Sequence, residues 1–201
     1  NFIRKKAFLL KDAPIVVDDY HPVPSLQERK KMEATAQSLA RAFGDGAERG
    51  RMKADLTLQE AMPPRGVAII SGEDTPGVGE SGMARFYVVN VGKGDVPANE
   101  SLTAMQELAR LGSCLASEGL LGWRSKQVEK LPQMLHDAFI RSRAEALERT
   151  KGQHGRTAEA IAHMMVGYEC MLYYLRDVGA LTDDEARKAY THAWGVVTDN
   201  S

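Results

Sequence analysis

The sequence has only two cysteines and no hydrophobic run long enough to cross a bilayer. Cys114 and Cys170 lie far apart within helical patterns, which favours buried free thiols over a disulfide or a metal site. A membrane-spanning helix needs about 18 to 20 consecutive apolar residues, and no signal-peptide pattern begins the chain. We therefore expect a cytoplasmic protein that makes no membrane contact.

An excess of charge of one sign is also missing. The chain has 26 basic and 27 acidic residues, which gives a formal net charge of −1. The surface is therefore not basic throughout, and any contact with nucleic acid must come from local patches. With 201 residues, the chain is long enough for one large domain or two small ones, each with a hydrophobic core.

A phosphate-binding loop of the form G-x-x-x-x-G-K-[ST] is absent. Residues 77–82 (GVGESG) do match G-x-G-x-x-G, but residues 86–91 (FYVVNV) then predict a strand instead of the helix that the dinucleotide fingerprint requires. The acidic side chains of Glu73, Asp74 and Glu80 would also repel phosphate. We therefore exclude a Rossmann site. For a nucleotide triphosphatase, the phosphate loop must lie upstream of Asn1, and we expect the chain to begin inside a larger protein.

What the sequence does contain is a short apolar strand that ends in two acids, residues 13–19 (APIVVDD). Three consecutive β-branched residues predict a strand buried on both faces. Ligands of open α/β sheets bind at the carboxyl ends of the strands. This is the Walker B pattern, in which Asp18 would hold Mg²⁺ through water and Asp19 would orient or deprotonate the attacking water. The alternative is that the acids only mark the end of a strand.

Two further strands are predicted, at residues 67–70 and 86–91, and polar residues stand beside both. Ser71 and Glu73 follow the first of them, and Arg85 precedes the second. The glycine-rich loop 44–55 carries Arg49, Arg51 and Lys53, which either contact phosphates of DNA or of a neighbour's nucleotide, or lie on a solvated hairpin.

Most of the chain has helical periodicity. We predict helices at residues 2–11 and 26–43 in the first part of the chain. From residue 96 onward only helices are expected, at 99–117, about 123–150, 155–178 and 182–198, with joints such as the segment between Gly119 and Gly122. Pro132 either kinks the second of these four or lies in its first turn. Thr182 and Glu185 form a capping box, and Trp123 and Trp194 are expected to be packing anchors.

The order of these features resembles ring-forming ATPases of the AAA+ and RecA-like kind. In those proteins the strand after Walker B ends in a polar sensor, and an arginine reaches across the subunit interface. The segments LLKDAPIVVDDYHP, GAERGRMKAD, PPRGVAIISGED and ARFYVVNV also resemble helicase-like proteins of prophages and integrative elements, similar to the domain of unknown function 927 and cassette-chromosome helicase group. The resemblance covers about residues 1–95, and the helical region follows more loosely.

This resemblance implies a fold class and a set of site residues. The fold would be α/β followed by all-α: residues 1–95 would form the C-terminal half of a P-loop ATPase core that lacks the Walker A half, and residues 96–201 a helical bundle. Asp18 and Asp19 would be the Walker B acids, with Asp18 on Mg²⁺. Ser71 and Glu73 would be sensor residues, and Arg85 the arginine finger.

The resemblance also implies a function. The chain would belong to an ATP-dependent DNA helicase or translocase that replicates a mobile genetic element, with ATP and Mg²⁺ as cofactors. Its partners would be single-stranded DNA, further copies in a ring and the upstream Walker A segment of the same protein. Two alternatives remain open: a non-catalytic DNA-binding or oligomer-assembly module, and an ATPase-like loader or adaptor.

Overall fold

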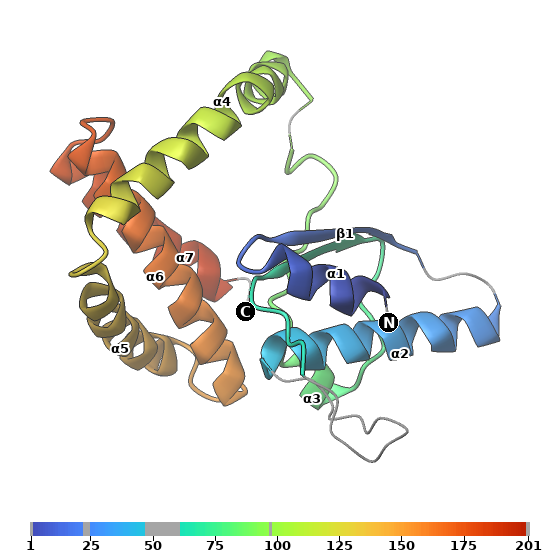
Figure 1. Ribbon diagram of the computed structural model, residues 1–201. Helices are drawn as coiled ribbons and strands as arrows, with labels where there is room; N and C mark the ends of the chain where they lie inside the picture. The colour runs from blue at the N-terminus through green and yellow to red at the C-terminus, as the bar shows by residue number, and fades with distance from the viewer. Residues whose placement is uncertain (1, 22–24, 47–60, 97, 200–201) are drawn as a thin grey trace. The chain divides into compact units, whose positions relative to one another are not determined.

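The structure is a computed structural model that describes residues 2–21, 25–46, 61–96 and 98–199. The chain divides into two compact units, Asn1–Phe86 and Tyr87–Ser201, whereas the sequence analysis ends the first domain at residue 95. Unit 1 contains α1 (Phe2–Leu10), β1 (Ile15–Tyr20), α2 (Leu26–Gly44), β2 (Ala68–Gly72) and α3 (Glu80–Met83) (Figure 1). Unit 2 contains α4 (Glu100–Lys126), α5 (Leu131–Arg149), α6 (Gly155–Asp177) and α7 (Asp183–Asp199). The described chain is thus an α/β segment followed by helices, as predicted at this coarser level.

The sheet of unit 1 consists of β1 and β2, which are parallel. The register pairs Ile15 with Ala68 and Val17 with Ile70. Two parallel neighbours need a crossover connection, and α2 lies in the connection between them. Both strands therefore end at the same edge of the sheet, where Asp18, Asp19, Ser71 and Glu73 lie.

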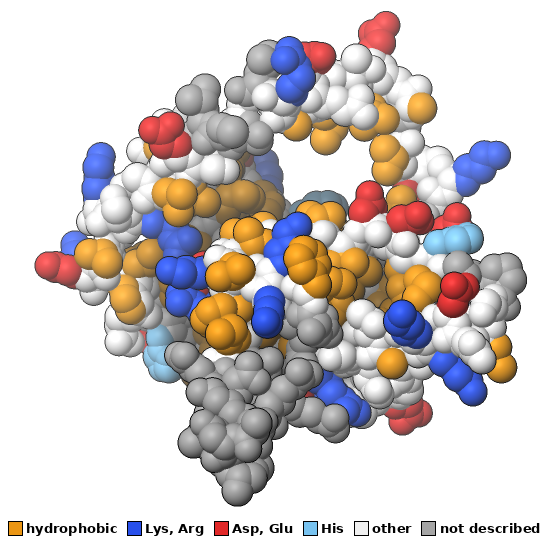
Figure 2. Space-filling model, turned by 45° about the vertical axis from the view of Figure 1, so that its right-hand side comes forward, with side chains coloured by type: hydrophobic (Ala, Val, Ile, Leu, Met, Phe, Trp, Pro, Cys, Tyr) orange, Lys and Arg blue, Asp and Glu red, His pale blue; other side chains and the backbone are white. Residues whose placement is uncertain are grey.

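The prediction that β1 is buried on both faces was wrong. Ile15 is buried, but Val16 and its register partner Ile69 are 66% and 55% exposed. Hydrophobic side chains lie among charged ones on the surface that Figure 2 shows. Apolar residues on both faces allow a parallel strand to be buried on both sides. Whether it is buried depends on other elements that pack against each face, which the strand's own sequence does not reveal.

The predicted strand at residues 86–91 was also wrong, because within the described residues the sheet has two strands and this segment belongs to neither. Tyr87 packs against the helical core of unit 2 instead. Its hydroxyl donates a hydrogen bond to the Val197 carbonyl oxygen at 3.0 Å, and burial raises the pKa of this phenol. High β propensity does not make a strand when tertiary contacts elsewhere stabilise the segment.

The core of unit 2 lies among α5, α6 and α7. Ile161 and Met165 of α6 and Trp194 of α7 are almost completely buried there, together with Ala146 and Ala158. The alanines allow close approach of neighbouring helices, and the larger side chains fill the space between them. The prediction that Trp194 is a packing anchor is confirmed.

Helix α4 continues through the glycines at which the sequence predicted a joint. A Cβ atom on Gly119 would lie 2.3 Å from the Tyr174 hydroxyl oxygen of α6, so this glycine allows close helix approach. Trp123 then donates its indole N–H to Asp177 at 2.7 Å. Helix α4 ends at Lys126. Pro132 lies in the first turn of α5, where backbone N–H groups have no acceptor within the helix, so the N–H that proline lacks is not missed.

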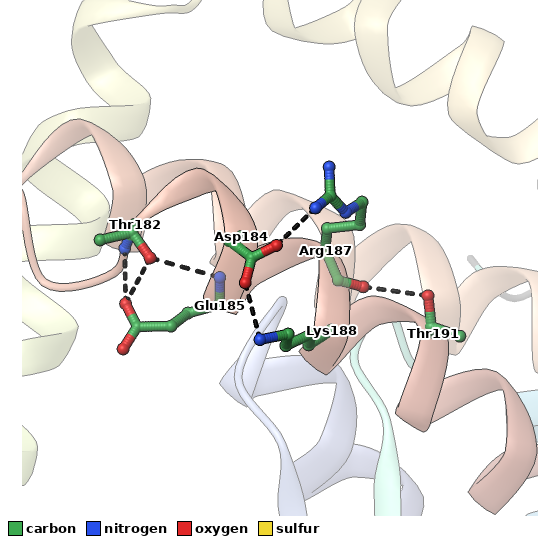
Figure 3. Close-up of polar contacts among 6 residues, drawn as sticks. All are labelled: Thr182, Asp184, Glu185, Arg187, Lys188 and Thr191. Atoms are coloured by element: carbon green, nitrogen blue, oxygen red, sulfur yellow. Dashed lines mark hydrogen bonds and ion pairs between the residues drawn. The ribbon is translucent and has the colours of Figure 1, made fainter.

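The predicted capping box at the start of α7 is confirmed (Figure 3). The Thr182 backbone N–H and hydroxyl donate to a Glu185 carboxylate oxygen at 2.8 and 2.6 Å. The Glu185 backbone N–H donates to the Thr182 hydroxyl oxygen at 3.3 Å. These bonds favour the ionised carboxylate, so the pKa of Glu185 lies below its ordinary value of 4.5, first through the hydroxyl and then through the backbone N–H.

Replacing Glu185 by glutamine is expected to make thermal stability less dependent on pH. A lowered folded-state pKa contributes stability that is present above the ordinary glutamate value and is lost as pH falls through the folded-state value. Melting temperatures from about pH 6 to about pH 3 should therefore fall less for Glu185→Gln than for the parent chain. Glu129→Gln, at an exposed position before α5, is the control and should keep the parent profile. Equal slopes for all three proteins would contradict the assignment.

Among the described residues, no helix has both the length and the apolar character that crossing a bilayer requires.

Candidate functional site

The parallel register brings Asp18 and Ser71 together at the carboxyl edge of the sheet. Asp18 lies near the end of β1, Ser71 lies near the end of β2, and both are exposed. The Ser71 hydroxyl donates a hydrogen bond to Asp18 Oδ1. Asp18 and Ser71, which were predicted as site residues from separate motifs, are thus in direct contact.

Asp19 has a left-handed backbone conformation with φ of 62°. Its N–H donates to Asp18 Oδ1 at 3.1 Å and to Ser71 Oγ at 3.2 Å. The β1–β2 register becomes irregular between Val17 and Tyr20, as it does at a bulge. Aspartate is one of the few residues that adopt this conformation readily. The bulge therefore interrupts the strand's regular alternation at the second acid, and the Ser71 hydroxyl contacts both acids.

Glu73, the other sensor candidate, contacts His21, which the sequence analysis did not select. The His21 Nδ1 and Glu73 Oε2 atoms are 2.9 Å apart, with more than half of each side chain exposed. Such an exposed pair contributes little to stability. His21 could have been identified from its position directly after β1, because parallel strands place the residues after β1 opposite those after β2.

The environment of these strand ends is acidic. The pKa of the Tyr20 phenol is raised, first by burial and then by the carboxylates of Glu33 and Asp74. Within the described ranges, no group of three or more His, Cys, Asp or Glu side chains is placed to hold a metal ion. A magnesium ion commonly takes one or two protein carboxylates and completes its shell with water and substrate phosphates. The Asp18 carboxylate fits that limited role.

Arg85 makes its hydrogen bonds away from the two strand-end acids. It follows α3 instead of opening a strand. Its Nε and one terminal nitrogen donate to the two carboxylate oxygens of Asp45 at 3.0 and 3.1 Å. The other terminal nitrogen donates to the carbonyl and the hydroxyl of Ser81. The guanidinium is therefore bound within its own unit.

The proposed nucleic-acid contacts Arg49, Arg51 and Lys53 lie outside the described residues. They remain predictions from the sequence.

The chain was also compared with known proteins. No family model matched it, and neither the curated proteins nor the solved structures contained a match.

Proposed function

We propose that this chain is part of an ATP-dependent DNA helicase or translocase that serves the replication of a mobile genetic element. The observation that supports the proposal most strongly is the contact between Asp18 and Ser71 at the ends of adjacent parallel strands. The resemblance to ring-forming ATPases implies such a pair, with an acid on the Walker B strand beside a polar sensor side chain on the next strand. The finer fold assignment, a P-loop core without its Walker A half, is part of the same proposal.

In this proposal each residue at the sheet edge has one task. Asp18 would hold a Mg²⁺ ion through water, and the ion would neutralise charge on the phosphates of ATP. Asp19 orients the attacking water and accepts its proton. Ser71 fixes the Asp18 carboxylate and the Asp19 backbone, and Glu73 lies where a polar group could sense the terminal phosphate.

The proposal requires parts that the described residues do not supply. A Walker A segment upstream in the same protein would bind the phosphates. Further copies in a ring would supply an arginine in trans, for which Arg85 is the candidate. Single-stranded DNA would bind to basic segments, with Arg49, Arg51 and Lys53 as candidates.

A second candidate function is a non-catalytic module for DNA binding or oligomer assembly. Two observations favour it: the described carboxylates do not gather into a metal-binding group, and the Arg85 guanidinium is bound to Asp45. In such a protein the acids would only end β1.

The test is ATP hydrolysis by the protein with its upstream sequence restored, measured with and without single-stranded DNA. We expect hydrolysis that requires Mg²⁺ and rises when DNA is added. Salt-dependent DNA binding with no hydrolysis under either condition would contradict the motor and favour the second candidate. DNA-stimulated hydrolysis without strand displacement would instead indicate a loader or adaptor.

A further inference from the structure

Arg85 is largely buried, and all three nitrogens of its guanidinium donate hydrogen bonds. Its side chain is only 10% exposed, and that of Asp45 is 34% exposed. Asp45 binds the guanidinium through both carboxylate oxygens, which is the strongest geometry for this pair of groups. Ser81 accepts from the remaining terminal nitrogen through two oxygens. Most of the N–H groups of the guanidinium are therefore in use.

The backbone is shaped to receive this side chain. A Cβ atom on Gly44 would lie 2.9 Å from Arg85 Cγ and 3.1 Å from its Cβ and Cδ. The aliphatic part of Arg85 thus lies directly on the last residue of α2, and a side chain at position 44 would force Arg85 to move. Asp45 is the next residue. The end of α2 therefore contacts the aliphatic part of the Arg85 side chain through Gly44 and binds its guanidinium through Asp45.

The ligands of Arg85 resemble the anion that an arginine finger would contact. A carboxylate and a phosphate can each accept two parallel N–H···O bonds from the guanidinium fork, so they compete for the same N–H groups. An arginine held by Asp45 cannot contact a phosphate of a neighbouring copy at the same time. Arg85 could therefore act on the nucleotide of a neighbouring copy only after its contact with Asp45 is broken.

We propose that Asp45 and Ser81 form a latch that holds Arg85 in an inactive position. The latch opens when a second copy presents the polyphosphate of a bound nucleoside triphosphate. This inference rests on the proposed function, because it assigns a regulatory contact to the arginine of that site. It explains how the same side chain is bound within one subunit at rest and acts on another during turnover.

The first experiment measures ATP turnover per subunit in the protein with its upstream sequence restored. Asp45→Asn keeps the shape of the latch and removes its charge, so turnover is expected to rise several-fold. Arg85→Ala should abolish turnover, and the double variant should behave like Arg85→Ala. Ser81→Ala, which weakens the other side of the latch, is a second opening variant in case Asp45→Asn does not fold. Unchanged or lower turnover in folded opening variants would overturn the latch and leave Arg85 as a structural brace.

A second readout separates failure of the latch from failure of the proposed function. In the present chain, the Arg85 Nε–H resonance is followed by NMR during titration with inorganic tripolyphosphate. The Asp45→Asn chain is expected to show a saturable shift, and the parent chain a much weaker one. If no variant hydrolyses ATP, the motor fails, but this difference would still support a releasable anion-binding arginine. Equal responses in both chains would overturn it.

Discussion

Replacement of Asp19 by asparagine is expected to reduce ATP turnover by about 10²–10⁴-fold in the protein with its upstream sequence restored, which is the range for loss of a general base. Asparagine also tolerates a left-handed backbone, so the φ of 62° and the N–H bonds to Asp18 and Ser71 can persist. The loss should therefore reflect the missing carboxylate and not an altered turn. Nucleotide binding, measured by fluorescence titration, should remain close to that of the parent.

The matched control is Asp74→Asn, which removes an acid from the neighbouring loop. The Asp74 side chain accepts a hydrogen bond from the Thr75 backbone N–H, and an amide oxygen can replace it. Its turnover should stay within about twofold of the parent, as expected for a surface substitution. If Asp19→Asn retained parent turnover while Asp74→Asn lost it, Asp19 would not be the base.

The second large effect concerns the core of unit 2. Ile161→Ala is expected to lower the free energy of unfolding by about 2–5 kcal/mol, since it removes a completely buried side chain and leaves a cavity. Ile161 packs in the cluster that contains Met165 and Trp194. Urea denaturation followed by the circular dichroism of the helices would measure the change.

Ile140→Ala on α5 is the control for this experiment, because the same atoms are removed from a side chain that is 54% exposed. Its effect should be under about 1 kcal/mol. Equal losses for the two variants would show that the cluster around Ile161 does not stabilise unit 2 as a core.

The sequence predicted those features that depend on neighbouring residues. Helical periodicity and the Thr182–Glu185 capping box are set within a few turns of chain, and α1, α2, α6 and α7 lie close to their predicted ranges. β1 and β2 were also predicted, because continuous β-branched runs are typical of parallel strands. Their parallel register followed only once the structure was known.

The features that the sequence missed depend on distant contacts. Residues 86–91 have the composition of a strand, but Tyr87 finds its partner at Val197, over a hundred residues away. Gly119 is a residue type typical of a joint between helices, but here it lies inside a helix and leaves room for Tyr174 of another helix. Local pattern gives no information about such partners.

The candidate site was predicted in part for the same reason. Asp18 and Ser71 each lie near the carboxyl end of a predicted strand, so their proximity became predictable once the two strands were taken as neighbours. The partners of Arg85 were not predictable, since Asp45 is 40 residues away and nothing in its surroundings marks it as a ligand. Site residues at the ends of regular elements are thus easier to find than those held by loops.

The parallel register of β1 and β2 also has a consequence for the order of folding. Pairing Ile15 with Ala68 must close a long stretch of chain, whereas α5 and α6 are joined by a short turn. Closing a longer loop costs more entropy, and contacts between distant residues form later. During refolding, amide protection measured by pulsed hydrogen exchange is therefore expected to appear in α5 and α6 before it appears in β1. The acidic sheet edge would then be among the last parts of the chain to form.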